Sequence, residues 1–294
     1  MGGAKIGLVE LPLALMNPGD LLLLPDPGYP DYLSGVSLGR VAYETFLLTA
    51  KNDFLPDLDA IPEETARRAK FIYINYPNNP TGAVATKAFY EKLVAWAKTY
   101  EVGVVSDLAY GALGYRGYEN PSFLSTPGAK DVGIEFYTFS KTFNMAGWRL
   151  AFAAGNARMI EALNLIQDHL FVGIFPALQE AGIAALLDPK SEEAVAQLNA
   201  VYDSRRDAFT QSAAKIGWQA FPSKGSFYAW MPVPEGYTSE SFADLLLEKA
   251  HVAVAPGKGF GPAGDAYVRI GLLVEPERLV EAVDRIANLH LFNN

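Results

Sequence analysis

One lysine lies in a run of small and apolar residues, FSKTFNMAGWR at 139–149, and an arginine follows it eight positions later. The preceding residues, VGIEFYTFS, have the pattern of a β-strand, so Lys141 is expected at a strand end with little water around it. Burying an ammonium group is costly unless the protein uses it. We therefore expect the protein to use the Lys141 amine.

Polar side chains also follow two earlier strand-like runs. Asn78 and Asn79 come after FIYINYP, and Asp107 comes after VGVVS, with Tyr110 three residues further on. A single polar residue at a strand end is usually a cap or turn residue. In open α/β sheets, however, ligands gather outside the carboxyl ends of the strands. Polar residues after three successive strands therefore predict a site at one edge of a sheet.

The elements that must position these residues alternate along the chain. Strands are predicted at 71–75, 102–107, 135–140 and 149–155, and helices with apolar positions three and four apart at 86–100 and 156–170. This alternation predicts an α/β fold, with a mostly parallel sheet covered by helices on both faces.

The character of the chain changes after LLDPKSEE. A long helix at 191–216 leads to three further predicted strands, within GSFYAWMPV, VAVAPGKGF and AYVRIGLL. We therefore predict a large domain over 1–188 and a smaller C-terminal α+β domain over 189–294.

Composition narrows the classes of partner. The 294 residues carry a formal net charge of -9, which disfavours binding to nucleic acid or anionic lipid. The longest apolar runs are far shorter than the roughly 20 residues of a membrane helix, and no leader peptide is evident. The chain has 0 cysteines, so disulfides and thiolate chemistry are excluded. We expect a soluble, cytoplasmic protein.

Several site chemistries lack their residues. The 3 histidines are scattered without the spacing of metal ligands, so no metal site is expected. The sequence has no G-x-S-x-G elbow and no G-x-x-x-x-G-K-[ST] loop, and GKGFGPAG leads to a strand instead of opening a helix. A partly desolvated lysine near an aspartate, a tyrosine and an asparagine remains. That set suits a carbonyl cofactor held as a Schiff base.

In order along the chain, PNNPTG, SDLAY, SKTFNMAGWR and YVRIG resemble the motifs of fold-type I pyridoxal phosphate enzymes of aminotransferase class I/II. The resemblance runs through essentially the whole chain. It implies the pyridoxal 5'-phosphate-dependent transferase fold and transfer of an amino group between an amino acid and a 2-oxo acid. It also implies a role in amino-acid metabolism and biosynthesis, and a homodimer.

The resemblance assigns roles by position to the residues of these motifs. Lys141 resembles the catalytic lysine that forms the Schiff base, and Asp107 the carboxylate that keeps the pyridine nitrogen protonated. Tyr110 and Asn79 resemble the pair that binds the ring 3'-oxygen, and Tyr29 the aromatic residue stacked on the ring.

The remaining positions concern the phosphate and the substrate. The start of GGAKIGLVELPLAL resembles a phosphate-binding helix N-terminus, with Gly3, Ala4 and Lys5 acting through backbone groups. The other phosphate ligands implied are Thr138, Ser140 and Arg149. Arg269 in YVRIG resembles the arginine that binds the substrate α-carboxylate as a bidentate fork, with Asn79 also placed at the substrate.

The sequence departs from the family pattern in two places. Related enzymes carry an N-terminal segment before the phosphate loop, with a substrate-gating arm and a tyrosine that reaches the neighbouring subunit, whereas this sequence starts at the loop. Ile6 stands where related sequences often have glutamate. The missing segment leaves a truncated cofactor-binding module without turnover open as an alternative. A lyase dependent on pyridoxal phosphate also stays open, because it would share every cofactor residue.

Subfamily features are weaker. SKTFNMAGWRLAF and DHLFVGIFPALQEA resemble most the group of LL-diaminopimelate aminotransferases and the methionine-salvage transaminase that acts on 2-oxo-4-methylthiobutanoate. Aromatic residues near the predicted site, among them Phe143 and Phe227, are compatible with an apolar substrate side chain or with an ordinary core.

Overall fold

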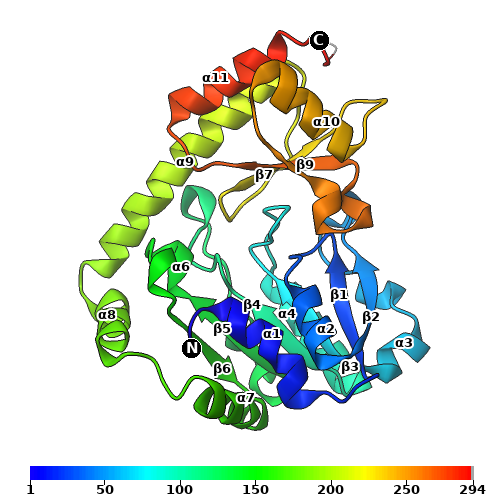
Figure 1. The fold of residues 1–294 in the computed structure, drawn as a ribbon, viewed down its shortest axis with the longest axis vertical. Helices are drawn as coiled ribbons and strands as arrows, with labels where there is room; N and C mark the ends of the chain where they lie inside the picture. Colours follow the sequence, from blue (N-terminus) through cyan, green and yellow to red (C-terminus); the bar gives the residue numbers. More distant parts are fainter. Residues whose placement is uncertain (293–294) are drawn as a thin grey trace.

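The computed structural model describes residues 1–292, and a six-stranded sheet forms its larger part (Figure 1). The strand order is β2-β1-β3-β4-β5-β6, and every neighbouring pair is parallel except β5 and β6. The strands are β1 (Leu21–Asp26), β2 (Ala42–Leu47), β3 (Ala69–Asn75), β4 (Gly103–Asp107), β5 (Gly133–Thr138) and β6 (Ala151–Gly155). The predicted mostly parallel sheet is confirmed.

Alternate residues of these strands pack into two separate cores. Leu21 and Leu23 of β1 belong to one core, whereas Leu22 and Leu24 belong to the other. Successive side chains of a strand point to opposite faces, so a strand that is apolar at every position needs cover on both sides. The all-leucine run of β1 thus fits a strand sandwiched between helices.

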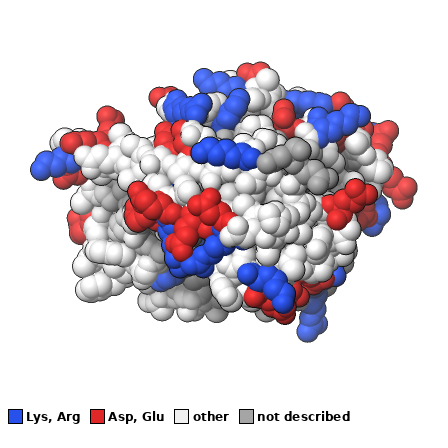
Figure 2. All heavy atoms as spheres, turned by 90° about the horizontal axis from the view of Figure 1, so that it is seen from above, with Lys and Arg blue, Asp and Glu red and all other residues white. Residues whose placement is uncertain are grey.

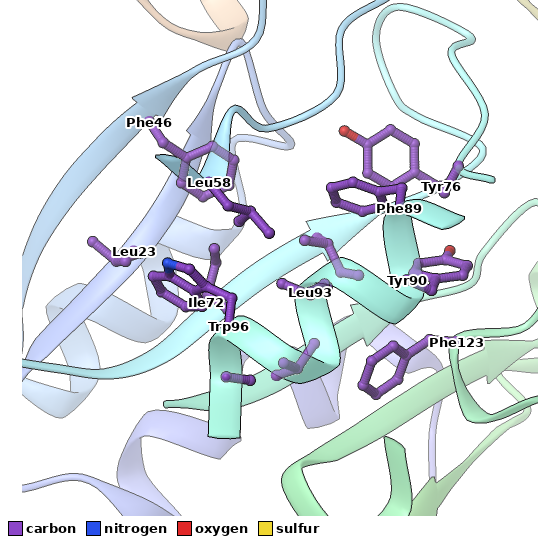
Figure 3. Close-up of a cluster of buried hydrophobic side chains, with 14 of the residues drawn as sticks. Leu23, Phe46, Leu58, Ile72, Tyr76, Phe89, Tyr90, Leu93, Trp96 and Phe123 are labelled. Carbon is purple, nitrogen blue, oxygen red and sulfur yellow. The ribbon is translucent and has the colours of Figure 1, made fainter. Parts of the chain in front are cut away.

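Helices supply this cover. On one face, α1 (Ala4–Leu15) packs against α2 (Tyr32–Gly39) and α7 (Ala157–Leu170). On the other face lies α4 (Lys87–Tyr100), which is capped by Thr86, whose side chain accepts a hydrogen bond from Phe89 N. Figure 3 shows Trp96 of α4 directed toward Leu23 and Ile72 of the sheet. In the same view, Phe89 lies beside Tyr76 and Tyr90 lies beside Phe123.

The C-terminal part builds a second, smaller sheet. Its antiparallel strands follow the order β7-β9-β8, with bounds β7 (Tyr228–Pro232), β8 (Ala255–Pro256) and β9 (Tyr267–Gly271). Three helices pack with this sheet, namely α9 (Ser191–Lys215), α10 (Ser239–Leu245) and α11 (Pro276–Ala287). In Figure 1, α9 runs from beside α8 (Pro176–Leu187) to α11 at the far end of the molecule. Residue 189 lies between α8 and α9, and the division of the chain there stays a prediction.

Three short helices complete the larger part: α3 (Glu63–Arg68), α5 (Ala129–Val132) and α6 (Phe139–Thr142).

The ion pairs over α10 and α11 join exposed side chains, as in Lys258–Glu240 at 2.6 Å and Arg278–Glu281 at 2.5 Å. Figure 2 shows this face from above, with acidic and basic side chains interspersed. Exposed pairs contribute little to stability, so the buried cores hold these helices in place.

Three differences from the predicted elements have physical reasons. The strands β1 and β2 are not among those predicted, because a short leucine run fits a buried helix equally well and β2 is an edge strand that buries only Phe46. The strand predicted within VAVAPGKGF is reduced to Ala255–Pro256, since the chain then turns into a 3₁₀ helix at Gly257–Phe260.

Within the described residues, none of the helices combines the length and the apolar character required for a membrane span.

Candidate active site

A cavity of about 530 Å³ opens at the carboxyl ends of β3, β4 and β5, where ligands of open α/β sheets gather. It brings together almost all of the residues that the sequence predicts at the site. Those that line it are Ala4, Lys5, Tyr29, Asn79, Asp107, Tyr110, Thr138, Ser140, Lys141, Arg149 and Arg269. Gly3 lies next to this set, as the residue that precedes α1.

Asp107 is the last residue of β4 and is only 5% exposed. Tyr32 donates a hydrogen bond to its Oδ2 at 2.9 Å, whereas its buried Oδ1 has no partner among the described residues. Desolvation raises the pKa of Asp107 to about 6, against which the Tyr32 hydroxyl acts. A buried carboxylate oxygen without a donor fits the protonated ring nitrogen of pyridoxal phosphate.

Lys141 lies in α6, directly after β5, and is half-buried. Burial lowers the pKa of its amine, and the positive charges of Arg149 and Arg269 lower it further. The amine also lies 5.4 Å from the centre of the Phe227 ring. A lower pKa increases the neutral fraction of the amine, which is the form that attacks a carbonyl or accepts a proton.

Another part of the cavity is suited to an anion. Helix α1 begins at Ala4, and its first backbone N–H groups have no partners within the helix. A Cβ atom at Gly3 would lie 2.3 Å from Nη2 of Arg149, so the guanidinium in its present position leaves no room for a side chain there. Gly3 has φ 104°, which glycine also tolerates best.

Two hydroxyls complete this anion-binding part of the cavity. Thr138 Oγ1 accepts a hydrogen bond from Ser140 N at 3.2 Å, and the two side-chain oxygens lie 3.0 Å apart. Arg149 is itself oriented by a hydrogen bond to Ala146 O at 2.9 Å. A helix N-terminus, an arginine and two hydroxyls form a donor set that suits the phosphate of the cofactor. Lys5 contributes differently, because its amine pairs with Asp31 at 2.8 Å.

Arg269 projects from β9 of the smaller sheet and contacts Asn79, which lies in the turn after β3 of the larger sheet. Its Nη1 donates a hydrogen bond to Asn79 Oδ1 at 2.7 Å. Its guanidinium lies 4.2 Å from the centre of the Tyr228 ring and 4.6 Å from that of Phe260. Contacts with two aromatic rings favour a cation at this position and restrict the movement of the guanidinium.

The structure also places residues at the site that sequence reasoning missed. Asn75 ends β3, and its Nδ2 donates to Asp107 O at 2.8 Å while its Oδ1 accepts from Asn79 N at 2.8 Å. Tyr228 also lines the cavity, and its hydroxyl oxygen lies 3.3 Å from that of Tyr110. The strand-end rule could have identified Asn75, but no local signal points to Tyr228.

Asn78 was predicted at the same edge, but it does not line the cavity. Its Oδ1 accepts hydrogen bonds from the backbone and the hydroxyl of Thr81, at 3.0 and 2.8 Å. The amide of Asn78 therefore stabilises the turn after β3, and the strand-end polar position at the cavity belongs to Asn75.

This fold and this donor set define the class of transferases dependent on pyridoxal phosphate. Residues 1–286 match the family model described as aminotransferase class I and II. The chain belongs to this family.

Relatives of known function and structure agree with this result. The chain is 57% identical over 290 residues to L-glutamine--4-(methylsulfanyl)-2-oxobutanoate aminotransferase of Bacillus subtilis, covering 99% of this chain and 72% of the relative. It is 49% identical over 284 residues to LL-diaminopimelate aminotransferase of Moorella thermoacetica, covering 97% of this chain and 72% of the relative. Substrate-bound BacF from Bacillus subtilis superposes with a TM-score of 0.94 at 47% identity, covering 99% of this chain and 74% of that one.

The protein is therefore an aminotransferase that depends on pyridoxal phosphate and moves an amino group between an amino acid and a 2-oxo acid. The cofactor supplies a carbonyl that bonds to amino groups and a ring that accepts electrons. The protein must hold it, keep its ring nitrogen protonated and move protons at the substrate.

Proposed function

We propose that Lys141 and Asp107 act on opposite sides of the bound cofactor, as the residue that bonds its carbonyl and the residue that holds its ring nitrogen. The observation that carries this proposal is that an amine of lowered pKa and a buried, unpartnered carboxylate oxygen line the same cavity. Tyr29, Tyr110 and Asn79 complete the ring site, with Tyr29 on its face.

The phosphate binds, in this proposal, at the helix end of the cavity. The backbone of Gly3, Ala4 and Lys5, the hydroxyls of Thr138 and Ser140, and the guanidinium of Arg149 hold it. Nitrogen and hydroxyl donors there match the charge of a phosphate, since a helix N-terminus favours an anion by its dipole as well.

Nζ of Lys141 also carries the proton of the reaction. It accepts the proton from the substrate α-carbon and delivers it to the carbonyl carbon of the cofactor. This role requires an amine that is easily deprotonated. The two arginines near Lys141 support this role, because their charges disfavour its ammonium form.

Arg269 binds the α-carboxylate of either substrate as a bidentate fork, and Asn79 holds the guanidinium in place. The rings of Tyr228 and Phe260 both contact that guanidinium and restrict its rotation. Both substrates of a transaminase carry this carboxylate, so one arginine serves both half-reactions.

For the substrate side chain we propose an uncharged group, with 4-(methylsulfanyl)-2-oxobutanoate as the first 2-oxo acid to test. Aromatic residues at the cavity and the 57% identical Bacillus subtilis enzyme, whose name carries this substrate, support this choice. The experiment supplies purified protein and pyridoxal phosphate with glutamine and this 2-oxo acid, and in parallel with LL-diaminopimelate and 2-oxoglutarate. The proposal expects faster transfer in the first pair, and faster transfer in the second would overturn it.

The same assay separates the alternative functions. A lyase consumes the amino acid when the 2-oxo acid is left out, whereas a transaminase stops after converting one equivalent of cofactor. A module without turnover binds pyridoxal phosphate, as seen in its absorbance, but transfers no amino group in either pair.

We further propose a homodimer in the cytoplasm, with a large domain at 1–188 and a small domain at 189–294. Exposed apolar residues between α7 and α8 support an interface, with Val172 86% and Phe175 69% exposed. Sedimentation should give about twice the protomer mass of 31.9 kDa. A protomer-sized species at micromolar concentration would count against the dimer.

A further inference from the structure

A loop of the small sheet contacts the carboxyl end of β1 beside the cavity. Asp26, the last residue of β1, is 5% exposed and accepts a hydrogen bond at Oδ1 from Ala263 N at 3.0 Å. Two residues further on, Gly28 N donates to Phe260 O at 2.7 Å. These two bonds connect residues more than 200 positions apart and tie the loop 257–264 to the larger sheet.

The loop has a backbone shaped for this contact. Gly261 has φ 128°, a conformation that other residues rarely adopt. A Cβ atom at this position would lie 2.2 Å from Asp26 Oδ1. The loop can approach the carboxylate only because Gly261 has no side chain.

The other end of the loop is held within its own side of the molecule. Ser239 Oγ donates to Asp265 Oδ1 at 2.7 Å and accepts a hydrogen bond from Lys258 N at 3.1 Å. Asp265 therefore fixes the loop to α10, whereas Asp26 fixes it to the larger sheet. The two aspartates act on the same loop from opposite sides.

The loop carries a side chain that contacts a residue of the cavity. The ring centre of Phe260 lies 4.6 Å from the guanidinium of Arg269, which lines the cavity. Phe260 O is the acceptor of the bond from Gly28. The position of this ring therefore depends directly on how the loop is seated on β1.

We propose that Asp26 is a positioning residue, which seats the loop 257–264 so that Phe260 orients Arg269 for the substrate carboxylate. This inference rests on the role of Arg269 given under the proposed function. Asp26 acts through the loop and contacts neither cofactor nor substrate. Its effect should appear in the binding of carboxylate substrates and not in the chemistry at Lys141.

The test compares four variants of the full chain loaded with pyridoxal phosphate. Asp26→Ala removes the acceptor, and Asp26→Asn keeps an oxygen that can accept from Ala263 N. Asp20→Ala is the matched control, because Asp20 precedes β1 at its opposite end and its carboxylate accepts a turn bond from Asn17 N at 2.8 Å. Arg269→Ala reports on the carboxylate site itself.

Asp26→Ala should raise KM for both substrates about 5- to 30-fold, the range for one lost hydrogen bond that leaves a donor unpaired, with kcat within about 3-fold. Asp26→Asn and Asp20→Ala should stay within about 3-fold of the parent in KM. Cofactor absorbance should be the same in all of these variants.

An unchanged KM in Asp26→Ala, while Arg269→Ala raises it, would overturn the positioning role and leave the proposed function intact. An unchanged KM in Arg269→Ala would overturn the proposed role of that arginine, and the inference with it. If Asp26→Ala does not fold, Gly261→Ala decides the question in the same assay, because it displaces the loop while Asp26 is kept. A raised KM supports the proposal and an unchanged KM overturns it.

Discussion

Asp107 ends β4 and Lys141 follows the neighbouring strand β5 of one sheet, whereas Arg269 lies on a strand of the other sheet. The cofactor end of the cavity is therefore positioned by strands whose hydrogen bonds run directly between them. The carboxylate end depends on a few contacts between the sheets, such as the bond from Arg269 to Asn79 and the loop bonds at Asp26 and Gly28.

The difference separates two kinds of sensitivity. A substitution at the cofactor end of the cavity removes a chemical group but leaves the hydrogen-bonded strands that position it unchanged. Such a substitution should affect turnover or cofactor binding. A change at the carboxylate end alters how one part of the molecule is seated on another, so it should affect substrate binding first. The predictions below test this division.

The largest effect is expected at Lys141. Lys141→Ala removes the proton carrier, and amino transfer should fall by at least about 10³-fold because positioned acid-base groups alone contribute about 10²- to 10⁴-fold. Steady-state kinetics with saturating cofactor measure this. Lys5→Ala is the control, since that amine lines the same cavity but pairs with Asp31, and it should lose less than about 10-fold. Equal losses in both variants would contradict the distinct role of Lys141.

Asp107→Asn should lower turnover by about 10²-fold, since a neutral amide does not hold the ring nitrogen in its protonated form. Kinetics with saturating cofactor measure this loss. Asp59→Asn, at an exposed carboxylate with 77% of its side chain accessible, serves as the control and should keep its activity.

The same variant should be more stable than the parent protein without cofactor. Burial raises the pKa of Asp107 from 3.8 to about 6, so between these values the folded protein keeps a proton that the unfolded chain has lost. The free energy of unfolding therefore falls as pH rises through this window, by about 3 kcal/mol for about two pKa units. Urea unfolding at pH 7 should show Asp107→Asn as more stable, with the advantage lost at pH 4. An equal advantage at both pH values would exclude this explanation.

Arg269→Lys should raise KM for both substrates about 10- to 100-fold, because a lysine cannot form the bidentate pair. Its affinity for the cofactor, measured by absorbance titration, should stay within about 3-fold. Arg278→Lys on α11, whose guanidinium pairs with the exposed Glu281, is the matched control and should leave KM unchanged. Loss of cofactor affinity in Arg269→Lys would show that the two ends are not separable.

Gly3→Ala should weaken cofactor binding about 10-fold, since its Cβ would collide with Arg149 Nη2 and the backbone has φ 104°. Gly147→Ala in the neighbouring loop is the control, because its Cβ would meet no atom within 4 Å. Equilibrium dialysis with pyridoxal phosphate compares the two. If Gly3→Ala instead raised only KM for the amino acid and left cofactor affinity unchanged, the proposed role of Gly3 in phosphate binding would be contradicted.

The same contrast explains what the sequence could predict. Asp107 and Lys141 could be located because an apolar strand followed by a polar residue is a local pattern, and parallel strands bring such ends together. The mostly parallel sheet and the small α+β part were predictable for the same reason, from the period of apolar residues.

Contacts between residues far apart in the sequence could not be predicted from a local pattern of this kind. Tyr228 reaches Tyr110 over a separation of 118 residues, and Asp26 reaches Ala263 over 237. Both depend on how the two sheets pack, which no short window of sequence records. Prediction from sequence is limited even within one turn. The motif contains both Asn78 and Asn79, but of these two only Asn79 lines the cavity.

The most direct test of the central claim is to locate the amine that bonds the cofactor. Borohydride reduction of the protein loaded with pyridoxal phosphate, followed by peptide mapping, fixes the cofactor covalently at the residue that holds it. Our account predicts one label per chain, on the peptide that contains Lys141. A label on Lys5 or any other lysine, or a label that persists in Lys141→Ala, would contradict it.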